Sequence, residues 1–166
     1  MSPSAQAAGA PAPAVRSPAT LSFDGDAINW RRLGEFEHFV YTVLDVDPVT
    51  ETADFVLKFE PDERIFLHRH RALTMTTVLA GEHRLYAPDG AVKEVRPLGS
   101  YTVAPPSADP HQEGGGARGA VVAYSTRGSA DGVVFEVLDG TGATVGSLGI
   151  ADLCALFELQ GGQPGA

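Results

Sequence analysis

The run from His68 to Gly81 reads HRHRALTMTTVLAG and holds two histidines separated by one residue. Successive side chains of a β-strand point to opposite faces, so His68 and His70 project to one side while Arg69 projects to the other. A third histidine, His111, follows in APPSADPHQEG, and strand pairing routinely brings such distant stretches together. Three neutral imidazoles suit Zn, Fe, Ni or Cu and leave coordination positions open. The sequence therefore predicts a three-histidine metal centre.

Composition and charge exclude several classes of protein. The 166 residues suffice for one domain with its own core. The formal net charge of −9 repels nucleic-acid phosphates and anionic membranes. No apolar run reaches the roughly 18 residues of a membrane helix, and the N-terminus lacks the pattern of a secretory signal. The single cysteine, Cys154, favours a reducing compartment. We therefore expect a cytoplasmic protein that binds neither nucleic acid nor membranes.

The chain divides into a tail, one domain and a short end. Residues 1–20 are mostly Ala, Pro and Ser, and we expect a disordered tail because they cannot bury enough apolar surface. Residues 21–160 form the single predicted domain, and residues 161–166 a flexible C-terminus. Short β-like runs separated by turn residues, including Gly114 to Gly116, fill the domain and indicate a sandwich or barrel. These runs are 37–47, 53–60, 73–81, 82–87, 91–96, 99–106, 119–128 and 132–139.

One helix is predicted near the C-terminus. Ile150, Leu153, Cys154 and Phe157 recur at the spacing of one helical face. Glycines mark both the start of this segment and its end. We expect the helix to cover an end or open face of the β structure, with Cys154 as a small apolar residue on its buried side.

Several motifs in this order resemble the two metal-binding motifs of the cupin superfamily. They are His-x-His, a glycine eleven residues later, a Pro-Leu-Gly turn, Pro105-Pro106 and the lone His111, all between Phe55 and Tyr124. The resemblance implies an all-β cupin double-stranded β-helix, or jelly roll, with a short C-terminal helix and the metal inside the barrel mouth. It also implies a homodimer or homotetramer, since cupins commonly pair.

One departure from the usual cupin pattern narrows the resemblance. Where many cupins carry a metal-binding glutamate, this chain has Thr74 and Met75. It is thus similar to the three-histidine cupins, which include acetylacetone-cleaving dioxygenase and 2,4'-dihydroxyacetophenone dioxygenase. The C-terminal run FEVLDGTGATVGSLGIADLCALFE also resembles the closing hairpin and helix of those enzymes.

The resemblance implies an enzyme that cleaves a carbon–carbon bond of a small diketone or hydroxyketone with O2. Its cofactor would be a divalent metal, with Fe(II) preferred and Zn or Ni as alternatives, and no catalytic residue is expected beyond the metal ligands. Neutral ligands leave the ion its full +2 charge, which strengthens binding of an anionic enolate. The polar residues that acetylacetone-cleaving members place around the metal are replaced here by Thr76, Tyr86 and Pro105. The reaction class is therefore better supported than the substrate.

Two alternative functions stay open. The run GSYTVAPPSADPH is also similar to the second motif of the ChrR-like anti-sigma cupins, which implies a Zn-binding or ligand-sensing regulatory protein. An oxygen-independent metal-dependent isomerase or lyase is a third possibility.

Four further residues are candidates near the metal. Glu113 lies two positions after His111 and could face the same side as a ligand or hydrogen-bond acceptor. We interpret it instead as a solvated glutamate beside the glycine run, the commoner situation for carboxylates. Thr74, Met75 and Tyr101 could line the site or a cavity, and we favour ordinary core positions for Met75 and Tyr101.

Other polar residues near the motifs receive weaker roles. We interpret His83 as an outward-facing strand residue and His38 as structural or exposed. Glu60 and Glu63 could orient a ligating imidazole through its second nitrogen. Arg69 and Arg71 should face away from the metal and form salt bridges.

Overall fold

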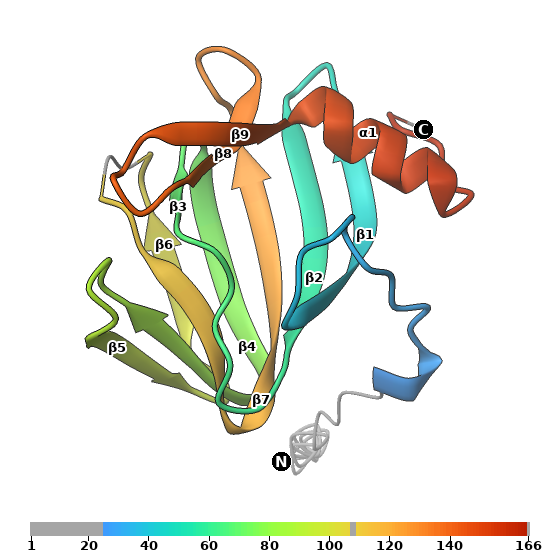
Figure 1. Cartoon of the computed structure of the whole chain (residues 1–166). Coiled ribbons are helices and arrows are strands. Elements are labelled where there is room, and N and C mark those ends of the chain that lie inside the picture. The colour runs from blue at the N-terminus through green and yellow to red at the C-terminus, as the bar shows by residue number, and fades with distance from the viewer. Residues whose placement is uncertain (1–24, 107–108, 166) are drawn as a thin grey trace, which may run out of the picture.

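The structure, a computed structural model, describes residues 25–106 and 109–165 (Figure 1). The predicted tail, residues 1–20, lies outside the described residues. A short 3-10 turn, Gly25–Ala27, precedes the strands. The strands of the described part are β1 (Phe39–Asp47), β2 (Thr52–Phe59), β3 (His68–His70), β4 (Leu73–Tyr86), β5 (Val92–Pro97), β6 (Tyr101–Ala104), β7 (Gln112–Arg127), β8 (Val133–Leu138) and β9 (Thr144–Gly149).

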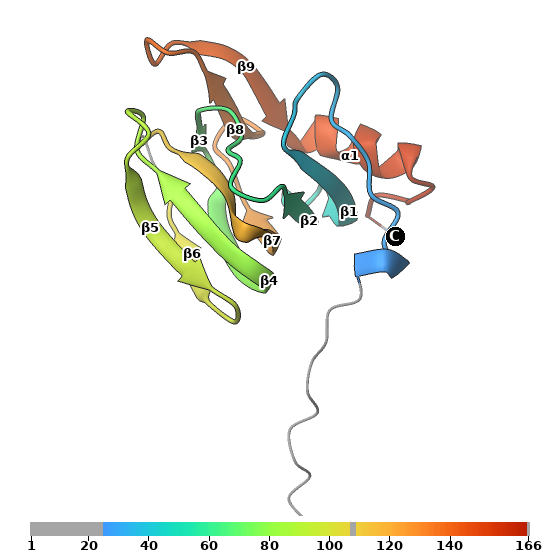
Figure 2. The ribbon, with the colours of Figure 1, turned by 60° about the horizontal axis from the view of Figure 1, so that its bottom comes forward.

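The strands form two antiparallel sheets. The larger runs β1-β2-β7-β4-β5, with β6 also paired to β4, and the smaller runs β3-β8-β9. The small sheet lies across the top of the curved large sheet in Figure 1, and Figure 2 shows the interior that the two enclose. Val46, Phe59, Val122 and Val134 are fully or almost fully buried between them. The predicted all-β jelly roll is confirmed.

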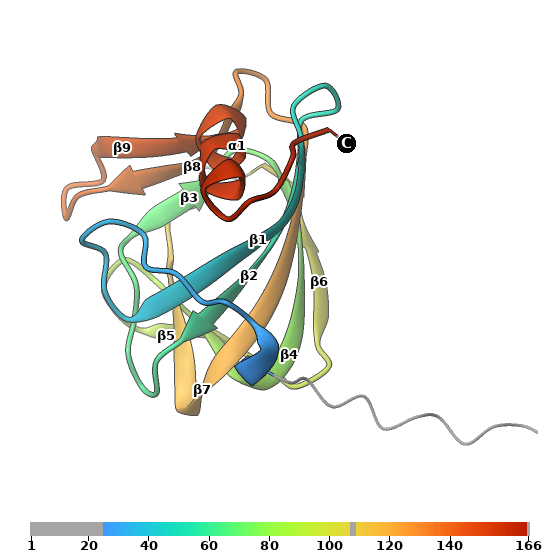
Figure 3. The same cartoon turned by 90° about the vertical axis from the view of Figure 1, so that its right-hand side faces the viewer.

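Helix α1 (Ile150–Leu159) confirms the helix predicted from the C-terminal pattern. The carboxylate of Asp152 accepts a hydrogen bond from the backbone N–H of Gly149 at 2.8 Å, which satisfies a free donor at the helix start. At the other end, the Gln160 side chain accepts a hydrogen bond from Val43 N–H and donates one to its carbonyl oxygen, both at 3.0 Å. The helix is thereby attached to β1 and covers one end of the barrel (Figure 3). Within the described part of the chain, no helix has the length and apolar character to cross a membrane.

Two strands are longer than predicted. β4 continues through Gly81, which adopts a φ of 69° where the pairing with β7 shifts register. β7 includes Gly114 to Gly116, which were predicted as a turn. That prediction was wrong. The strand needs a glycine here because the backbone of another segment passes close by, and a Cβ on Gly114 would collide with the carbonyl oxygen of Glu63. The glycines allow the segment around Glu63 to pass close to the strand.

Candidate metal centre

Backbone pairing between the two sheets brings the predicted ligands together. His68 N–H donates to the carbonyl oxygen of His111 at 3.0 Å, and His111 N–H donates to that of His68 at 2.9 Å. His68 and His70 belong to β3 of the small sheet, whereas His111 directly precedes β7 of the large sheet. Both β3 histidine side chains are buried, as the alternation along the strand predicts.

Four side chains can share one metal ion: His68, His70, His111 and Glu113. The Nε2 atoms of His68 and His70 are 3.2 Å apart. The Glu113 carboxylate lies 3.6 Å from Nε2 of His111, 3.8 Å from that of His68 and 4.0 Å from that of His70. Ligand atoms about 2.1 Å from a tetrahedral ion are roughly 3.4 Å apart, so these separations fit a single centre.

Hydrogen bonds orient all three imidazoles for metal binding. His68 and His111 each direct Nδ1 at the backbone carbonyl oxygen two residues earlier, at 3.1 and 3.3 Å. His70 Nδ1 lies 3.0 Å from Oγ1 of Thr74, whose hydroxyl donates to a backbone carbonyl and so accepts from His70. Because a carbonyl oxygen only accepts, each Nδ1 carries the proton and each Nε2 keeps a free lone pair. The 3.2 Å contact between two such nitrogens is repulsive unless a cation lies between them.

The electrostatics favour the ligating forms of His68, His70 and Glu113, whereas Glu113 favours protonation of His111 in the absence of a metal. Burial lowers the pKa of His68 and lowers that of His70 to about 3. Burial also acts to lower the pKa of His111, but the adjacent Glu113 outweighs it and the net direction is upward. Burial acts to raise the pKa of Glu113, yet His111 and the other imidazoles hold that pKa well below its usual range. Neutral His68 and His70 and an ionised Glu113 are the forms that bind metals.

The interpretation of Glu113 as a solvated glutamate was wrong. It is 2% exposed, and the Tyr124 hydroxyl donates to its Oε2 at 2.8 Å. The error came from reading the following glycines as a turn, whereas β7 keeps Glu113 opposite Leu85 of β4. The available signal was the two-residue spacing from His111, which places both side chains on one side of an extended segment. A coordinated carboxylate would reduce the charge of a divalent centre from +2 to +1, unlike the all-neutral site predicted.

His83 was also misinterpreted, since it is fully buried and not outward-facing. Its ring stacks on Phe59 with centroids 5.5 Å apart, and its Nε2 lies 3.7 Å from Oε1 of Glu113. Neither ring nitrogen has a hydrogen-bond partner among the described residues. Burial lowers the pKa of His83 and keeps the ring neutral. Side chains were expected to alternate regularly between the two faces along this strand. The pairing of β4 with β7 shifts register between Gly81 and His83, which interrupts that alternation.

The remaining candidates lie in different surroundings. Thr74 is 1% exposed and contacts His70, and Met75 is buried in the core. Tyr101 is 64% exposed, so both the core and the cavity positions considered for it were wrong. It lies on β6, a short strand paired to β4, where burial alternates and Tyr101 falls on the outer face.

The carboxylates considered as orienting groups contact another histidine. Glu60 lies 3.1 Å from Nδ1 of His38, and Glu63 lies 3.8 Å from its Nε2. The suggestion that they orient a ligating imidazole was wrong, because His38 lies outside the four-residue cluster. As predicted, Arg69 and Arg71 form salt bridges, with Glu136 and Asp131 respectively.

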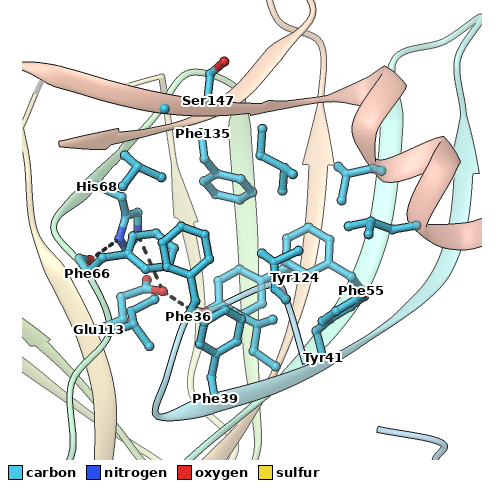
Figure 4. A pocket seen from close by; sticks show the side chains of 18 of the residues that line it. Phe36, Phe39, Tyr41, Phe55, Phe66, His68, Glu113, Tyr124, Phe135 and Ser147 are labelled. Carbon is cyan, nitrogen blue, oxygen red and sulfur yellow. Dashed lines mark hydrogen bonds and ion pairs between the residues drawn. The ribbon is translucent and has the colours of Figure 1, made fainter. Parts of the chain in front are cut away.

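A cavity of about 400 Å³ adjoins the candidate metal centre. His68 and Glu113 form part of its lining, and Figure 4 shows them at one side of the space. Five phenylalanines contribute much of the remaining wall: Phe36, Phe39, Phe55, Phe66 and Phe135. The centre therefore faces an apolar chamber inside the barrel, the usual form of a small-molecule site.

Comparison with solved structures identifies the architecture. An RmlC-like cupin protein from Ralstonia eutropha JMP134 superposes with a TM-score of 0.65 at 14% identity, covering 86% of this chain and 90% of the other. The fold is that of the cupins. An acetylacetone dioxygenase from Acinetobacter johnsonii superposes with a TM-score of 0.62 at 12% identity, covering 89% of this chain and 99% of that one.

A structure that contains an anti-sigma protein is similar over a shorter stretch. The complex of Rhodobacter sphaeroides SigE with the anti-sigma ChrR gives a TM-score of 0.50 at 20% identity, covering 62% of this chain and 51% of the matched chain. No protein-family model matches the sequence, and the search of curated proteins found no match. Identities this low establish the cupin fold alone.

Proposed function

We propose that this protein is an Fe(II)-dependent dioxygenase that cleaves a carbon–carbon bond of a diketone or hydroxyketone. The observation that carries the proposal is the set of three free imidazole Nε2 atoms and one buried carboxylate beside an apolar cavity. Such a donor set fits redox-active divalent metals as well as zinc. The fold shared with the acetylacetone dioxygenase from Acinetobacter johnsonii supports this reaction class.

Different residues of the chain would bind the metal, orient its ligands and exclude water from the substrate. A bound divalent ion would supply an electrophilic centre for the substrate oxygens and a site for O2 activation. The three histidines and Glu113 would hold it, and Thr74 would fix the His70 ring. The phenylalanine-rich cavity would exclude water, which strengthens electrostatic interactions inside and protects a reactive substrate. Each product would keep one oxygen atom of O2, so no external reductant is needed.

Oxygen consumption tests this proposal directly. Iron-loaded protein should consume O2 with a panel of diketones and hydroxyketones, and mass spectrometry with ¹⁸O2 should find label in both products. The His68→Ala variant should lose iron binding and oxygen uptake together. Turnover retained in the iron-free variant, or no oxygen uptake with any member of the panel, would contradict the proposal. Substrate loss without oxygen would favour the isomerase or lyase alternative.

One observation favours a second candidate, a Zn-binding regulatory protein. Four protein ligands around one ion are the arrangement of closed structural zinc sites, whereas catalytic sites keep a position free. The fold likeness to ChrR agrees with this alternative. Metal content after expression with balanced iron and zinc separates the two: tight zinc that exchanges slowly supports regulation, and iron supports the oxygenase.

We also propose that the protein forms a homodimer or homotetramer. Large apolar side chains on β5, β6 and the turn between them are exposed, and burying them against a second copy would remove them from water. They are Val92, Val95, Leu98, Tyr101 and Val103. Light scattering coupled to size exclusion measures the mass, and a monomer at micromolar concentration would contradict the proposal.

A further inference from the structure

We infer that the ligand of the cavity carries an uncharged apolar group of at least phenyl size, which extends from the metal centre toward helix α1. This inference rests on the proposed function only for the reacting end of the molecule, a diketone or hydroxyketone. The size, charge and direction of the apolar group follow from the cavity itself.

The polarity of the lining excludes a charged substituent. Its ionisable groups are His68, Glu113, Tyr41 and Tyr124, and the Tyr124 hydroxyl already donates to Glu113. No Lys or Arg contributes to this lining within the described residues. A carboxylate or phosphate placed here would lose its hydration without gaining a cationic partner, which is strongly unfavourable. An ammonium group would find no carboxylate among the described lining residues except Glu113, which belongs to the candidate metal site. The part of the ligand beyond that site must therefore be uncharged.

The volume of the cavity sets a minimum useful size. A water molecule occupies roughly 30 Å³ in the liquid, so a cavity of about 400 Å³ holds on the order of 13 non-hydrogen atoms. A five-carbon diketone would fill only about half of that space and leave apolar wall in contact with water. Replacing one terminal methyl by a phenyl ring fills most of the remainder, and the hydrophobic gain comes from this added contact.

The shape of the wall favours an aromatic group. Phe55 stacks on Tyr124 with ring centroids 5.1 Å apart, and Phe135 meets Phe55 edge-on at 5.9 Å. Phe135 also meets the His70 ring edge-on at 4.9 Å, so the aromatic wall continues up to the metal ligands. Figure 4 shows the rings of Phe55, Tyr124 and Phe135 around the space beside His68 and Glu113. Faces and edges of fixed rings suit a planar aromatic substituent.

Helix α1 limits the length of the ligand. Leu153 and Leu156 of α1 line the cavity, and Figure 4 shows the helix on the side opposite His68 and Glu113. Exposed lining residues lie before β1 and on β9 and mark the mouth: Phe36, Val145, Gly146 and Ser147. A ligand entering there meets the metal centre at one end and Leu156 at the other.

Binding of three related diketones tests the inference without turnover. Zinc-loaded protein is titrated by calorimetry with acetylacetone, benzoylacetone and benzoylacetone bearing a para-carboxylate. We expect benzoylacetone to bind at least tenfold tighter than acetylacetone, about 1.4 kcal/mol, and the carboxylated compound at least tenfold weaker than benzoylacetone. Equal affinities, an equally tight carboxylated compound, or no binding of any diketone would overturn the inference. If the preference holds but iron-loaded protein consumes no O2, the proposed function fails and this inference stands.

A pair of substitutions on α1 tests the direction of the ligand. Leu156→Trp should weaken benzoylacetone binding at least tenfold and leave acetylacetone within twofold, because only the longer ligand reaches the helix. Leu159→Trp is the matched control, since Leu159 is 70% exposed on the same helix and does not line the cavity. Circular dichroism establishes that both variants fold. The comparison of the three diketones with the wild-type protein does not depend on either variant. Equal losses for both ligands in folded Leu156→Trp protein would refute the role assigned to α1.

Discussion

Replacement of Glu113 by Gln is expected to weaken metal binding at least 100-fold. The substitution keeps the shape of the side chain and the acceptor for the Tyr124 hydroxyl, but it removes the negative charge at the centre of the imidazole cluster. A +2 ion and a coordinated carboxylate oxygen about 2.1 Å away attract by about 16 kcal/mol at an effective dielectric constant of 20. Desolvation of both charges offsets much of this attraction. A remainder of about 3 kcal/mol corresponds to roughly 100-fold in affinity.

Competition with a chromophoric chelator measures the affinity for Zn(II) in both proteins. Glu60→Gln is the matched control, because Glu60 is a half-exposed carboxylate that contacts His38 outside the cluster. Loss of a group outside the coordination sphere typically costs between about 10- and 100-fold, so a loss within that range would place the carboxylate outside the sphere. An affinity within threefold of wild type would refute the reasoning.

Three further predictions concern the stability of the metal-free protein, each measured by urea unfolding. Burial lowers the pKa of His70 from 6.5 to about 3, so between these values the unfolded chain binds a proton that the folded chain does not bind. The free energy of unfolding should therefore fall by about 3 kcal/mol between pH 7 and 4 from His70 alone. A free energy of unfolding that does not change with pH would contradict this. Tyr124→Phe removes the hydrogen bond to the Glu113 carboxylate and should lower the free energy of unfolding by about 2 kcal/mol; an unchanged midpoint would show that the bond contributes little. Gly81→Ala places a Cβ against the Gly119 carbonyl at positive φ and should lower the free energy of unfolding by about 3 kcal/mol or more. Gly34→Ala, also at positive φ but without a neighbour within 4 Å, should lower it by only about 1 kcal/mol. Equal losses in the two variants would exclude the close contact as the cause.

Local patterns along the chain were sufficient to predict the jelly roll and much of the candidate site. The alternation of His68 and His70 placed both rings on one face, and the helical spacing of Ile150 and Leu153 predicted α1. In each case a single element, with a regular period, determines which side chains point inward.

Where the period is interrupted, the sequence was misleading. Gly81 sits at a register shift, and the alternation beyond it placed His83 on the wrong face. The glycines after Glu113 have the composition of a turn, yet they form strand because another segment crosses them closely. That close crossing is a contact between residues distant in sequence, and nothing near Glu113 in the sequence indicates it.

The placement of the ligands on two different sheets affects how the barrel opens. β3 is only three residues long, and its backbone is held by its pairing with β8 and by the His68–His111 bridge to the segment before β7. An ion held by both β3 and Glu113 would act as a cross-link between the small sheet and β7. Without the ion, the amide hydrogens of β3, β8 and β9 should exchange with solvent well before those of β4 and β7. Since β9 borders the mouth of the cavity, the occupancy of the metal site would also control how readily a ligand enters.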